Sequence, residues 1–548
     1  MRKLFKPKSA ILIFLAVVCL FSGRLNAQNN PPLTVAIYDS AATTGYIFLA
    51  PYILTPPYTY DHPQMILDRY GNTVYYRVFM NGGIAATTAD FKLQSNCLMS
   101  FYSPILGKFY LMDSTFSVVD SVSAGNGFGT DTHELQILSD GHYLILGREM
   151  RVMNLTAYHW FGPSHNLPGS PNAEVTGSVV QELDENKNVI FQWKAHDHFD
   201  FGDVDPFWLS NPTSVDWTHS NALERDFDGN ILLSSRHFNE ITKIRKTDGG
   251  IIWRMGGKSN EFVFTNDTLG YTGQHDIRRL SDGHVTLWDN GQYTDPPVGR
   301  ALEFSLDETA KTATLEWGYI QDSGMFSYAM GNQQRLLNGD RFLTYGFISP
   351  PYPMVAHVKP DSTKVMEIFA PPGYGCYRAF NYETLPFSLN RPDSHCEKNG
   401  DVWYLVAEPG HSEYLWSTGE TTQSIQVTTP GRYQFFVPYG NDGHIGSEII
   451  VVNNLSGQED EFTEIEDQDF RIFPNPTPGN FTIASANIHF REKVAVELYS
   501  MLGTRILSID LTGTINEHLS LGKFPAGLYF VRIVADDKVE TIKLVKRN

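Results

Sequence analysis

Short apolar runs, each ended by a turn that contains glycine, recur along most of this chain. The segment from Asp216 to Gly257 holds four such runs, joined in pairs by turns at Gly229 and Gly249. Asp-Gly and Gly-Gly between apolar runs favour tight hairpins, because glycine tolerates the positive φ that these turns need. The segment therefore predicts four short antiparallel strands, the size of one propeller blade or of one sheet in a sandwich.

The same pair of hairpins is repeated along the chain. Full units are predicted at 91–122, 135–193, 222–254, 277–317 and 334–369, and a single hairpin at 65–79. Three units end in the same residue type, at Trp193, Trp253 and Trp317. The pattern predicts an all-β fold whose main part is a β-propeller of six blades, the sixth completed from both ends of the chain. Five or seven blades and a β-sandwich stay open as alternatives.

Changes in this pattern divide the rest of the chain. Residues 1–27 combine a basic start with an apolar run, as a secretory signal peptide does. That run is too short to span a bilayer and no other is long enough, so we expect no integral membrane segment. The β-propeller is predicted at 28–390, an Ig-like β-sandwich module at 396–455, an acidic linker at 457–469 and a small C-terminal β-sandwich domain at 470–548.

Charge excludes one class of partner. Without the signal, the chain carries 37 basic and 61 acidic residues, a net charge of −24. Such a surface repels nucleic acids and anionic membranes, so we expect no nucleic-acid partner.

Export makes disulfides possible among the three cysteines that follow the signal. Cys376 and Cys396 lie twenty residues apart around a segment with little pattern, and we predict a disulfide between them. In the loop-entropy account such a bridge contributes about 3 kcal/mol. Two unbridged thiols stay open as the alternative.

The candidate chemistry begins with three histidines that share one position in the repeat. His133 and His275 lie eight residues before the turn glycines of their units, and His219 lies ten before its own. The first strand of each propeller blade lines the central channel, so these imidazoles are expected to converge at one mouth of it. The strands that pair with these first strands end near three further candidate binding residues, Arg148, Arg236 and Asn290.

Three imidazoles are also a possible metal site. However, no carboxylate or cysteine shares their position in the repeat, and an arginine disfavours a cation. An arginine fork beside neutral imidazoles suits sulfate or phosphate, so we expect an anion site without a metal. His237 falls outside the shared position and is interpreted as a surface or loop residue. Glu134 and Asp276 each follow a candidate histidine, so they are expected to point away from it along a strand.

Three segments carry a resemblance. The stretches at 132–149, 216–244 and 273–291 look like the active-site strands of bacterial arylsulfate sulfotransferases, over a region of about 91–369. The resemblance implies a six-bladed propeller that moves a sulfuryl group between phenols without a nucleotide sulfate, a cofactor or a metal. It implies that His275 is the nucleophile and that His133 and His219 are further channel histidines. Arg236 then holds the sulfate together with Asn221.

The last segment carries a second resemblance. FRIFPNPTPGNFTI, VELYSMLGTRIL and FPAGLYFVRI, followed by a basic end, are similar to the C-terminal sorting domain of type IX secretion. This implies that the type IX machinery is a partner and that the protein is secreted or held at the cell surface.

The leading hypothesis is a secreted sulfotransferase. Its partners would be a small-molecule aryl sulfate as donor and a phenol as acceptor, with a sulfohistidine between the two steps. Arg148 and Asn290 are expected to contribute to substrate binding. The alternative is a non-catalytic cell-surface propeller that binds sulfated glycans or phenolics in the same funnel.

Overall fold

The computed structural model describes residues 33–546 except for several gaps, at 38, 40–42, 54–61, 82–83, 86, 163, 323–324, 349–351, 401, 453–461, 465–469, 474–476, 478, 501–504, 526 and 536–537. The predicted signal peptide and most of the predicted acidic linker lie outside these residues. The chain forms two compact units. The first contains residues 1–392, 407–423 and 435–447, and the second contains 393–406, 424–434 and 448–548.

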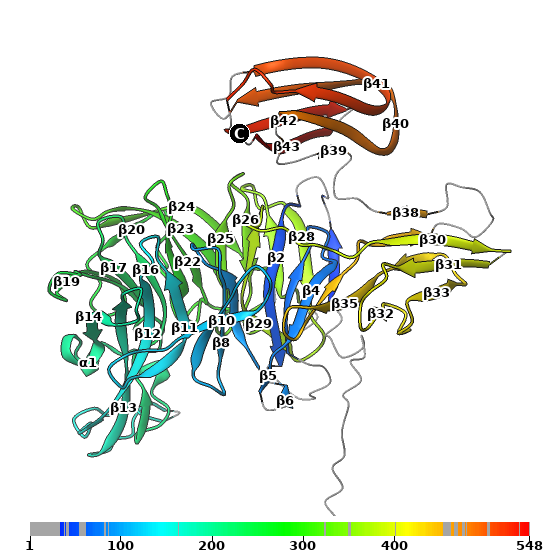
Figure 1. Cartoon of the computed structure of the whole chain (residues 1–548). Helices are drawn as coiled ribbons and strands as arrows, with labels where there is room; N and C mark the ends of the chain where they lie inside the picture. The colour runs from blue at the N-terminus through cyan, green and yellow to red at the C-terminus, as the bar shows by residue number, and fades with distance from the viewer. Residues whose placement is uncertain are drawn as a thin grey trace, which may run out of the picture. The chain divides into compact units, whose positions relative to one another are not determined.

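Among the described residues of the first unit, six sheets contain at least four strands each (Figure 1). Three of them follow one another in the chain. The first consists of β7 (Ala89–Leu93), β8 (Met99–Ser103), β9 (Lys108–Met112) and β10 (Val118–Val122). The second consists of β11 (Gly129–Ile137), β12 (Tyr143–Met153), β13 (Ala173–Leu183) and β14 (Val189–Lys194), with β15 (Ser214–Asp216) beside β13. The third consists of β16 (Ser220–Arg225), β17 (Ile231–Ser235), β18 (Glu240–Ile244) and β19 (Ile251–Gly256).

The next two sheets continue the series. They consist of β21 (His275–Arg279), β22 (Val285–Asp289), β23 (Arg300–Asp307) and β24 (Thr312–Ile320), with β20 (Val263–Thr265) beside β24; and of β25 (Asn332–Arg335), β26 (Arg341–Thr344), β27 (Val355–Val358) and β28 (Lys364–Phe369), with β1 (Thr34–Ile37) beside β28. A two-stranded piece is formed by β5 (Met80–Asn81) and β6 (Ile84–Ala85), and the short helices are α1 (Ala195–His198), η2 (Phe201–Asp203), η3 (Pro206–Trp208) and η4 (Arg236–Phe238).

The sixth sheet joins the two ends of the propeller sequence. Strand β29 (Tyr374–Tyr382) pairs antiparallel with β2 (Tyr46–Ile53), which is followed by β3 (Pro63–Leu67) and β4 (Thr73–Val78), as Figure 1 shows. The first strands of successive sheets contact one another from β7 through β11, β16, β21 and β25 to β29, and β29 contacts β7 again. This closed ring of radial sheets is the predicted β-propeller, with the last sheet built from both ends of the predicted region.

The segment predicted as a sandwich module at 396–455 is divided between the two units. Strand β36 (Gly443–Gly446) pairs with β4 and thereby extends the sixth sheet, together with β35 (Phe435–Tyr439) and β32 (Leu415–Trp416). The other strands of this segment belong to the second unit, namely β30 (Ser394–Asn399), β31 (Val402–Ala407), β33 (Ser424–Val427), β34 (Gly431–Tyr433) and β37 (Ile450–Val452), with β38 (Phe462–Glu464) beside β37.

The C-terminal region forms a sheet of its own within the second unit. Its strands are β39 (Phe470–Phe473), β40 (Asn480–Ser500), β41 (Arg505–Ser520), β42 (Gly527–Ala535) and β43 (Lys538–Lys546). The buried side chains of this region form an apolar cluster of their own, which includes Phe481, Leu498 and Leu544. None of the helices among the described residues is long and apolar enough to cross a membrane.

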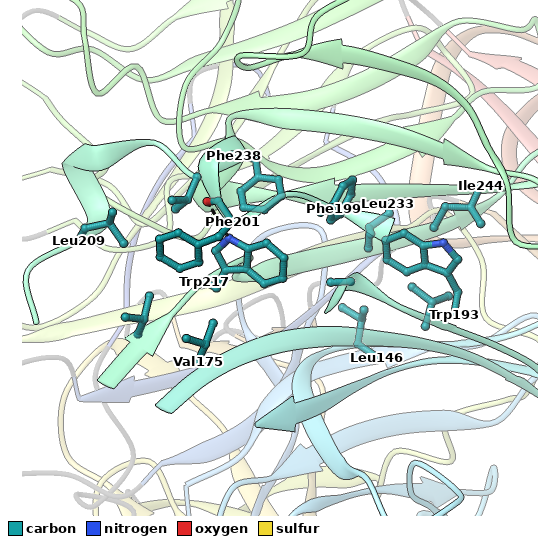
Figure 2. Close-up of a cluster of buried hydrophobic side chains, with 14 of the residues drawn as sticks. Leu146, Val175, Trp193, Phe199, Phe201, Leu209, Trp217, Leu233, Phe238 and Ile244 are labelled. Atoms are coloured by element: carbon teal, nitrogen blue, oxygen red, sulfur yellow. Dashed lines mark hydrogen bonds between the residues drawn. The ribbon is translucent and has the colours of Figure 1, made fainter. Parts of the chain in front are cut away.

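Aromatic side chains fill the space between neighbouring sheets. Figure 2 shows Trp193 and Trp217 in the cluster between the sheets of β11–β14 and β16–β19. The indole of Trp193 donates to the carbonyl of Gly249 at 3.1 Å, and that of Trp217 donates to the carbonyl of Phe201 at 3.3 Å. Truncating a buried aromatic of this size typically costs about 3–5 kcal/mol. Of the repeated tryptophans, Trp193 and Trp253 are therefore packing residues between sheets, and Trp317 is partly buried against another cluster.

The turn glycines and the strand bulges set the position of the central residues. Gly141, Gly229, Gly283 and Gly339 have φ between 80° and 93°, as the hairpin turns require. At the other end of the same first strands, the register of β7, β11, β16 and β21 shifts by a bulge. A bulge turns side chains out of the regular alternation. Asp90, Glu134, Asn221 and Asp276 lie in these four bulges, and Glu134 and Asp276 directly follow His133 and His275.

Candidate active site

The structure brings the three predicted histidines onto neighbouring strands. His133 lies in β11, His219 directly precedes β16, and His275 begins β21. The rings of His133 and His219 are 5.0 Å apart between centroids. His219 has a φ of 44°, so its backbone sits in the left-handed region that few non-glycine residues adopt. A residue held in this backbone region costs free energy, and such residues occur where the surrounding structure fixes the direction of the side chain.

His275 is held as a neutral ring with one defined tautomer. It is 1% exposed, and its Nδ1 lies 2.7 Å from Asn290 Oδ1 and 3.0 Å from the carbonyl of Gly273. Both partners are acceptors, so Nδ1 carries the hydrogen. Nε2 then holds the lone pair, toward which the backbone N–H of Met330 points at 3.2 Å. Burial lowers the pKa of His275 well below its usual value, and the charges of Arg236 and His219 add to this.

The two candidate asparagines bind His275 and the residue before it. The amide nitrogen of Asn290 donates to the carbonyls of Ser327 and Met330, at 2.9 and 3.1 Å, which fixes Oδ1 toward His275. Asn221 Nδ2 donates to the carbonyl of Gln274 at 2.7 Å and so ties β16 to the start of β21. Asn221 also has a second N–H that can donate to an anion.

Arg236 is a buried cation with unused hydrogen-bonding capacity. It begins η4 and is 5% exposed, with its guanidinium 3.9 Å from the ring centre of Trp208. Nη2 donates to the carbonyl of Tyr328 at 3.1 Å, and Nε has no partner among the described residues. Burial lowers the pKa of Arg236 to about 10, so the side chain remains charged at neutral pH. A buried, incompletely paired guanidinium favours a bound anion.

The interpretation of His237 as a surface residue was wrong. It is 6% exposed and stacks between Trp208 and His219, with centroid distances of 4.7 and 4.6 Å. Its Nδ1 donates to the carbonyl of Asp216 at 2.7 Å, and its Nε2 accepts from Arg236 Nη1 at 3.3 Å. The short helix η4 turns the chain directly after β17, and consecutive residues of that turn both face the site, which strand periodicity does not predict.

Two carboxylates that the sequence analysis did not select bind the other histidines. Asp131 Oδ1 lies 2.5 Å from His133 Nδ1, and Asp216 Oδ2 lies 2.5 Å from His219 Nδ1. Burial opposes ionisation, yet the contact with His219 keeps the pKa of Asp216 below its usual value. The spacings Asp-x-His and Asp-x-x-His are visible in the sequence and would have indicated these pairs. Each pair leaves Nε2 of its histidine free for proton transfer.

Arg148 lies in a different part of the site from His275. A cavity of about 290 Å³ is lined from β11, β12 and β13 and from the segment before β16, and it includes His133 and His219 with Arg148. His275, Arg236, Asn221 and Asn290 do not line it. Arg148 Nη2 donates only weakly, to the carbonyl of Thr130 at 3.4 Å, and its side chain is 55% exposed. The structure thus separates the predicted binding residues into two adjoining groups.

Beneath the histidines lies a set of charged residues that we call the inner ionic cluster: Asp90, Lys92, Glu134, Asp276, Arg278 and Arg378. Glu134 contacts Lys92 at 2.6 Å and Arg378 at 3.1 Å. Glu134 and Asp276 do point away from their histidines, as predicted, because they bind these cations. Asp276 has a φ of 61°, which the cluster holds directly after His275.

One group near the site has the composition of a cation site. Asp216, His219 and His237 place one possible ligand atom each within a few ångströms of the others. His219 Nδ1 bonds the Asp216 carboxylate, and both nitrogens of His237 are engaged, by Arg236 and by the carbonyl of Asp216, which leaves His219 Nε2 as the open nitrogen of the two rings. A cation here would also face the charge of Arg236, so these residues fit an anion site better than a metal site.

The predicted disulfide is not formed in the structure. Cys376 lies buried in β29, where its thiol donates to the carbonyl of Arg378 at 2.8 Å. Burial raises the pKa of this thiol to about 12, which keeps it protonated and unreactive. Cys396 belongs to the second unit. Spacing of the cysteines along the chain did not indicate that the first one points into the propeller core.

Comparison with known proteins agrees with this geometry. The family described as arylsulfotransferase (ASST) matches residues 39–372, and the family described as secretion system C-terminal sorting domain matches residues 471–547. The sorting domain directs the protein to the type IX machinery and so to the cell surface or the medium. An endo-acting ulvan lyase of Formosa agariphila is 28% identical over 152 residues, which span 28% of this chain and 28% of that relative.

Two solved structures were also compared. A protein of unknown function from Bacteroides caccae has a TM-score of 0.38 at 10% identity, covering 61% of this chain and 98% of its own. A catalytically inactive virginiamycin B lyase from Staphylococcus aureus has a TM-score of 0.33 at 8% identity, covering 73% and 100%. Because the match to the first family covers more than half of the residues and includes every candidate histidine, the chain belongs to the arylsulfotransferase (ASST) family.

Proposed function

We propose that this protein is a secreted sulfotransferase that moves a sulfuryl group from an aryl sulfate to a phenol through a sulfohistidine at His275. The observation that carries the proposal is the state of His275. It is a buried, neutral imidazole with Nδ1–H fixed by Asn290 and a lone pair on Nε2. An imidazole in this state is a nucleophile.

The first step breaks the ester bond of the donor. Nε2 of His275 attacks sulfur, the S–N bond forms, and the S–O bond breaks with its electron pair left on the phenolate. Arg236, with the second N–H of Asn221, stabilises the sulfuryl oxygens as charge moves in the transition state. His219 or His133, each backed by an aspartate, supplies a proton to the leaving oxygen when it is protonated.

The second step reverses the first with a new oxygen. A phenol gives its proton to one of the same histidines while its oxygen attacks sulfur, and His275 is released. Aromatic side chains near Arg236 support an aryl substrate: Trp208 lies under the guanidinium, and Tyr328 is 45% exposed with its ring 5.5 Å away. Two displacements through one covalent intermediate predict ping-pong kinetics.

The proposal is tested by mixing the purified protein with a chromogenic aryl sulfate in the absence of an acceptor. We expect one equivalent of phenolate in a burst and one sulfuryl group on the peptide that contains His275, located by mass spectrometry. A binding protein of the alternative type would retain the intact ester and give neither product.

The pH dependence of this burst follows from the burial of His275. Its pKa is lowered well below that of a free imidazole, so the neutral nucleophile persists to lower pH. We expect the burst rate to stay nearly constant between pH 8 and about 6 and to fall only in more acidic solution. Rapid-mixing kinetics at constant ionic strength measures this. A half-loss of rate at about pH 6.5 would show an unperturbed imidazole and contradict the assignment.

A further inference from the structure

We propose that the cavity beside His133 and His219 binds a neutral, polyhydroxylated acceptor of the carbohydrate class, so that this protein sulfates sugar hydroxyls. The inference rests on the proposed function and concerns the second half of the reaction, in which the acceptor attacks the sulfohistidine. It is carried by the chemistry of the cavity wall and by its place next to the two histidine–aspartate pairs.

Nearly every residue of the wall carries a hydrogen-bonding group, and the methyl, methylene and ring carbons of these residues supply the rest of its surface. Thr132 and Thr176 line it from β11 and β13, and the hydroxyl groups of Ser178 and Thr218 lie 2.7 Å apart on another side. The remaining wall includes Asp131 and Asp216, and no phenylalanine, tyrosine, tryptophan, leucine, isoleucine or valine is among the lining residues. A volume of about 290 Å³ lies at the lower end of the range of small-molecule sites, about 300–1,000 Å³.

The charge of the cavity excludes an anion as its main occupant. Two carboxylates, of Asp131 and Asp216, face one guanidinium, that of Arg148. Each carboxylate already holds a histidine at 2.5 Å, and each has further lone pairs that accept from a hydroxyl. A sulfate ester therefore suits the side of Arg236, whereas an uncharged molecule that donates several hydrogen bonds suits this cavity.

An aryl ring fits this wall poorly. It would displace water from Asp131, Thr132 and Thr176 without replacing the hydrogen bonds, and unmet polar groups oppose binding. A sugar ring replaces those bonds with its own hydroxyls. Sites built to bind substrate hydroxyls discriminate strongly against analogues that lack them. The aromatic surfaces of Trp208 and Tyr328, by contrast, lie on the Arg236 side of His237.

The transfer step is balanced. One sugar hydroxyl points at the sulfur on His275 while the rest of the sugar occupies the cavity. Its oxygen forms the new S–O bond, the S–N bond breaks with its electron pair returned to Nε2 of His275, and the hydroxyl proton moves to Nε2 of His219. The products are a sugar sulfate, neutral His275 and a protonated His219, which then returns its proton to the next leaving phenolate.

The test uses the mature secreted protein with an aryl sulfate donor and four acceptors in parallel: phenol, methyl glucoside, methyl xyloside and maltotriose. We expect sulfated sugar, detected by mass spectrometry, with kcat/KM for at least one saccharide equal to or above that for phenol. The methyl glycosides and the trisaccharide distinguish a free sugar from one unit of a chain. If His275 is labelled by the donor but only phenol or water removes the group, the inference is overturned while the proposed function stands. If His275 is not labelled, the proposed function itself fails.

A pair of variants ties the acceptor to this cavity. Thr176→Val removes one hydroxyl and keeps the shape of the side chain, and we expect the ratio of kcat/KM for saccharide over phenol to fall about tenfold. Thr312→Val, on β24 of another sheet, is the matched control and should leave the ratio as in the parent protein. An equal ratio in Thr176→Val and the parent, with both proteins folded, would place the acceptor elsewhere.

Discussion

His275→Ala should abolish turnover of aryl sulfates and leave no labelled protein. The substitution removes the buried imidazole whose Nδ1–H is fixed by Asn290 and Gly273, which places the lone pair on Nε2. Loss of a covalent nucleophile removes the reaction path itself, so residual activity should lie at the limit of detection, a decrease of at least about 10⁴-fold. Initial rates with a chromogenic aryl sulfate and mass spectrometry of the protein measure both outcomes.

The matched control for this variant is His284→Ala. His284 lies in the turn between β21 and β22, at the opposite end of the same hairpin, and its Nδ1 lies 2.8 Å from Glu303. It should lose little activity, within a few-fold. Arg236→Ala should fall between the two, slower by about 10²–10³, since it loses one partner of the sulfuryl oxygens and keeps the nucleophile. Retained turnover in His275→Ala would assign the nucleophile to another group.

The hairpin repeats could be predicted because glycine-containing turns between apolar runs are a strong local sequence signal. Gly141 and Gly229 occupy positive-φ turn positions, and counting back from such glycines placed His133, His219 and His275 at one end of neighbouring strands. Strand pairing preserves such a count along a hairpin, which is why Arg236 and Asn290 were also found. Counting residues from the turn glycine fails where a bulge or a turn interrupts the regular alternation of side chains along a strand.

The errors at the site have this physical cause. His237 lies in a 3₁₀ turn, so it and Arg236 both face inward, and Arg148 lies opposite Gly129, the first residue of β11, where its side chain reaches solvent. Asp131 lies two residues before its histidine, in the bulged part of β11, and Asp216 ends β15 three residues before its histidine, with a segment outside any strand between them. Cys376 lies in β29, which pairs with β2 from the other end of the predicted propeller region. The local sequence pattern around Cys376 does not identify a pairing strand so distant in the chain.

Arg378 is a further residue that the sequence analysis did not select, and its replacement should have the largest effect on stability. It lies on β29 with no exposed surface and contacts Asp90 at 3.3 Å and both Glu134 and Asp276 at 3.1 Å. Its Nη2 also donates to the carbonyl of Asn221 at 2.7 Å. One side chain from the closing strand thus holds the bulged segments of β7, β11, β16 and β21.

Arg378→Met keeps much of the length of the side chain and removes its charge. Three carboxylates then remain buried with only Lys92 and Arg278 to neutralise them, and breaking a buried ionic network in this way typically costs about 3–5 kcal/mol. The control is Arg245→Met, whose side chain is 46% exposed and pairs with Asp248, and which should change the unfolding free energy by less than about 0.5 kcal/mol. Urea unfolding followed by tryptophan fluorescence compares them.

The direction of the pH effect gives an independent test of the same cluster. Burial opposes ionisation of Glu134, yet Arg278, Arg378 and Lys92 hold its pKa well below the usual value in the folded protein. A group with a lowered folded pKa stabilises the fold above its unfolded pKa, near 4.3, and loses this contribution as the pH falls further. The stability gap between the parent and Arg378→Met should therefore be largest near neutral pH and narrow in acid. A gap that does not narrow as the pH is lowered below about 4.3, or a variant as stable as the parent, would show that the closing strand is held by packing alone.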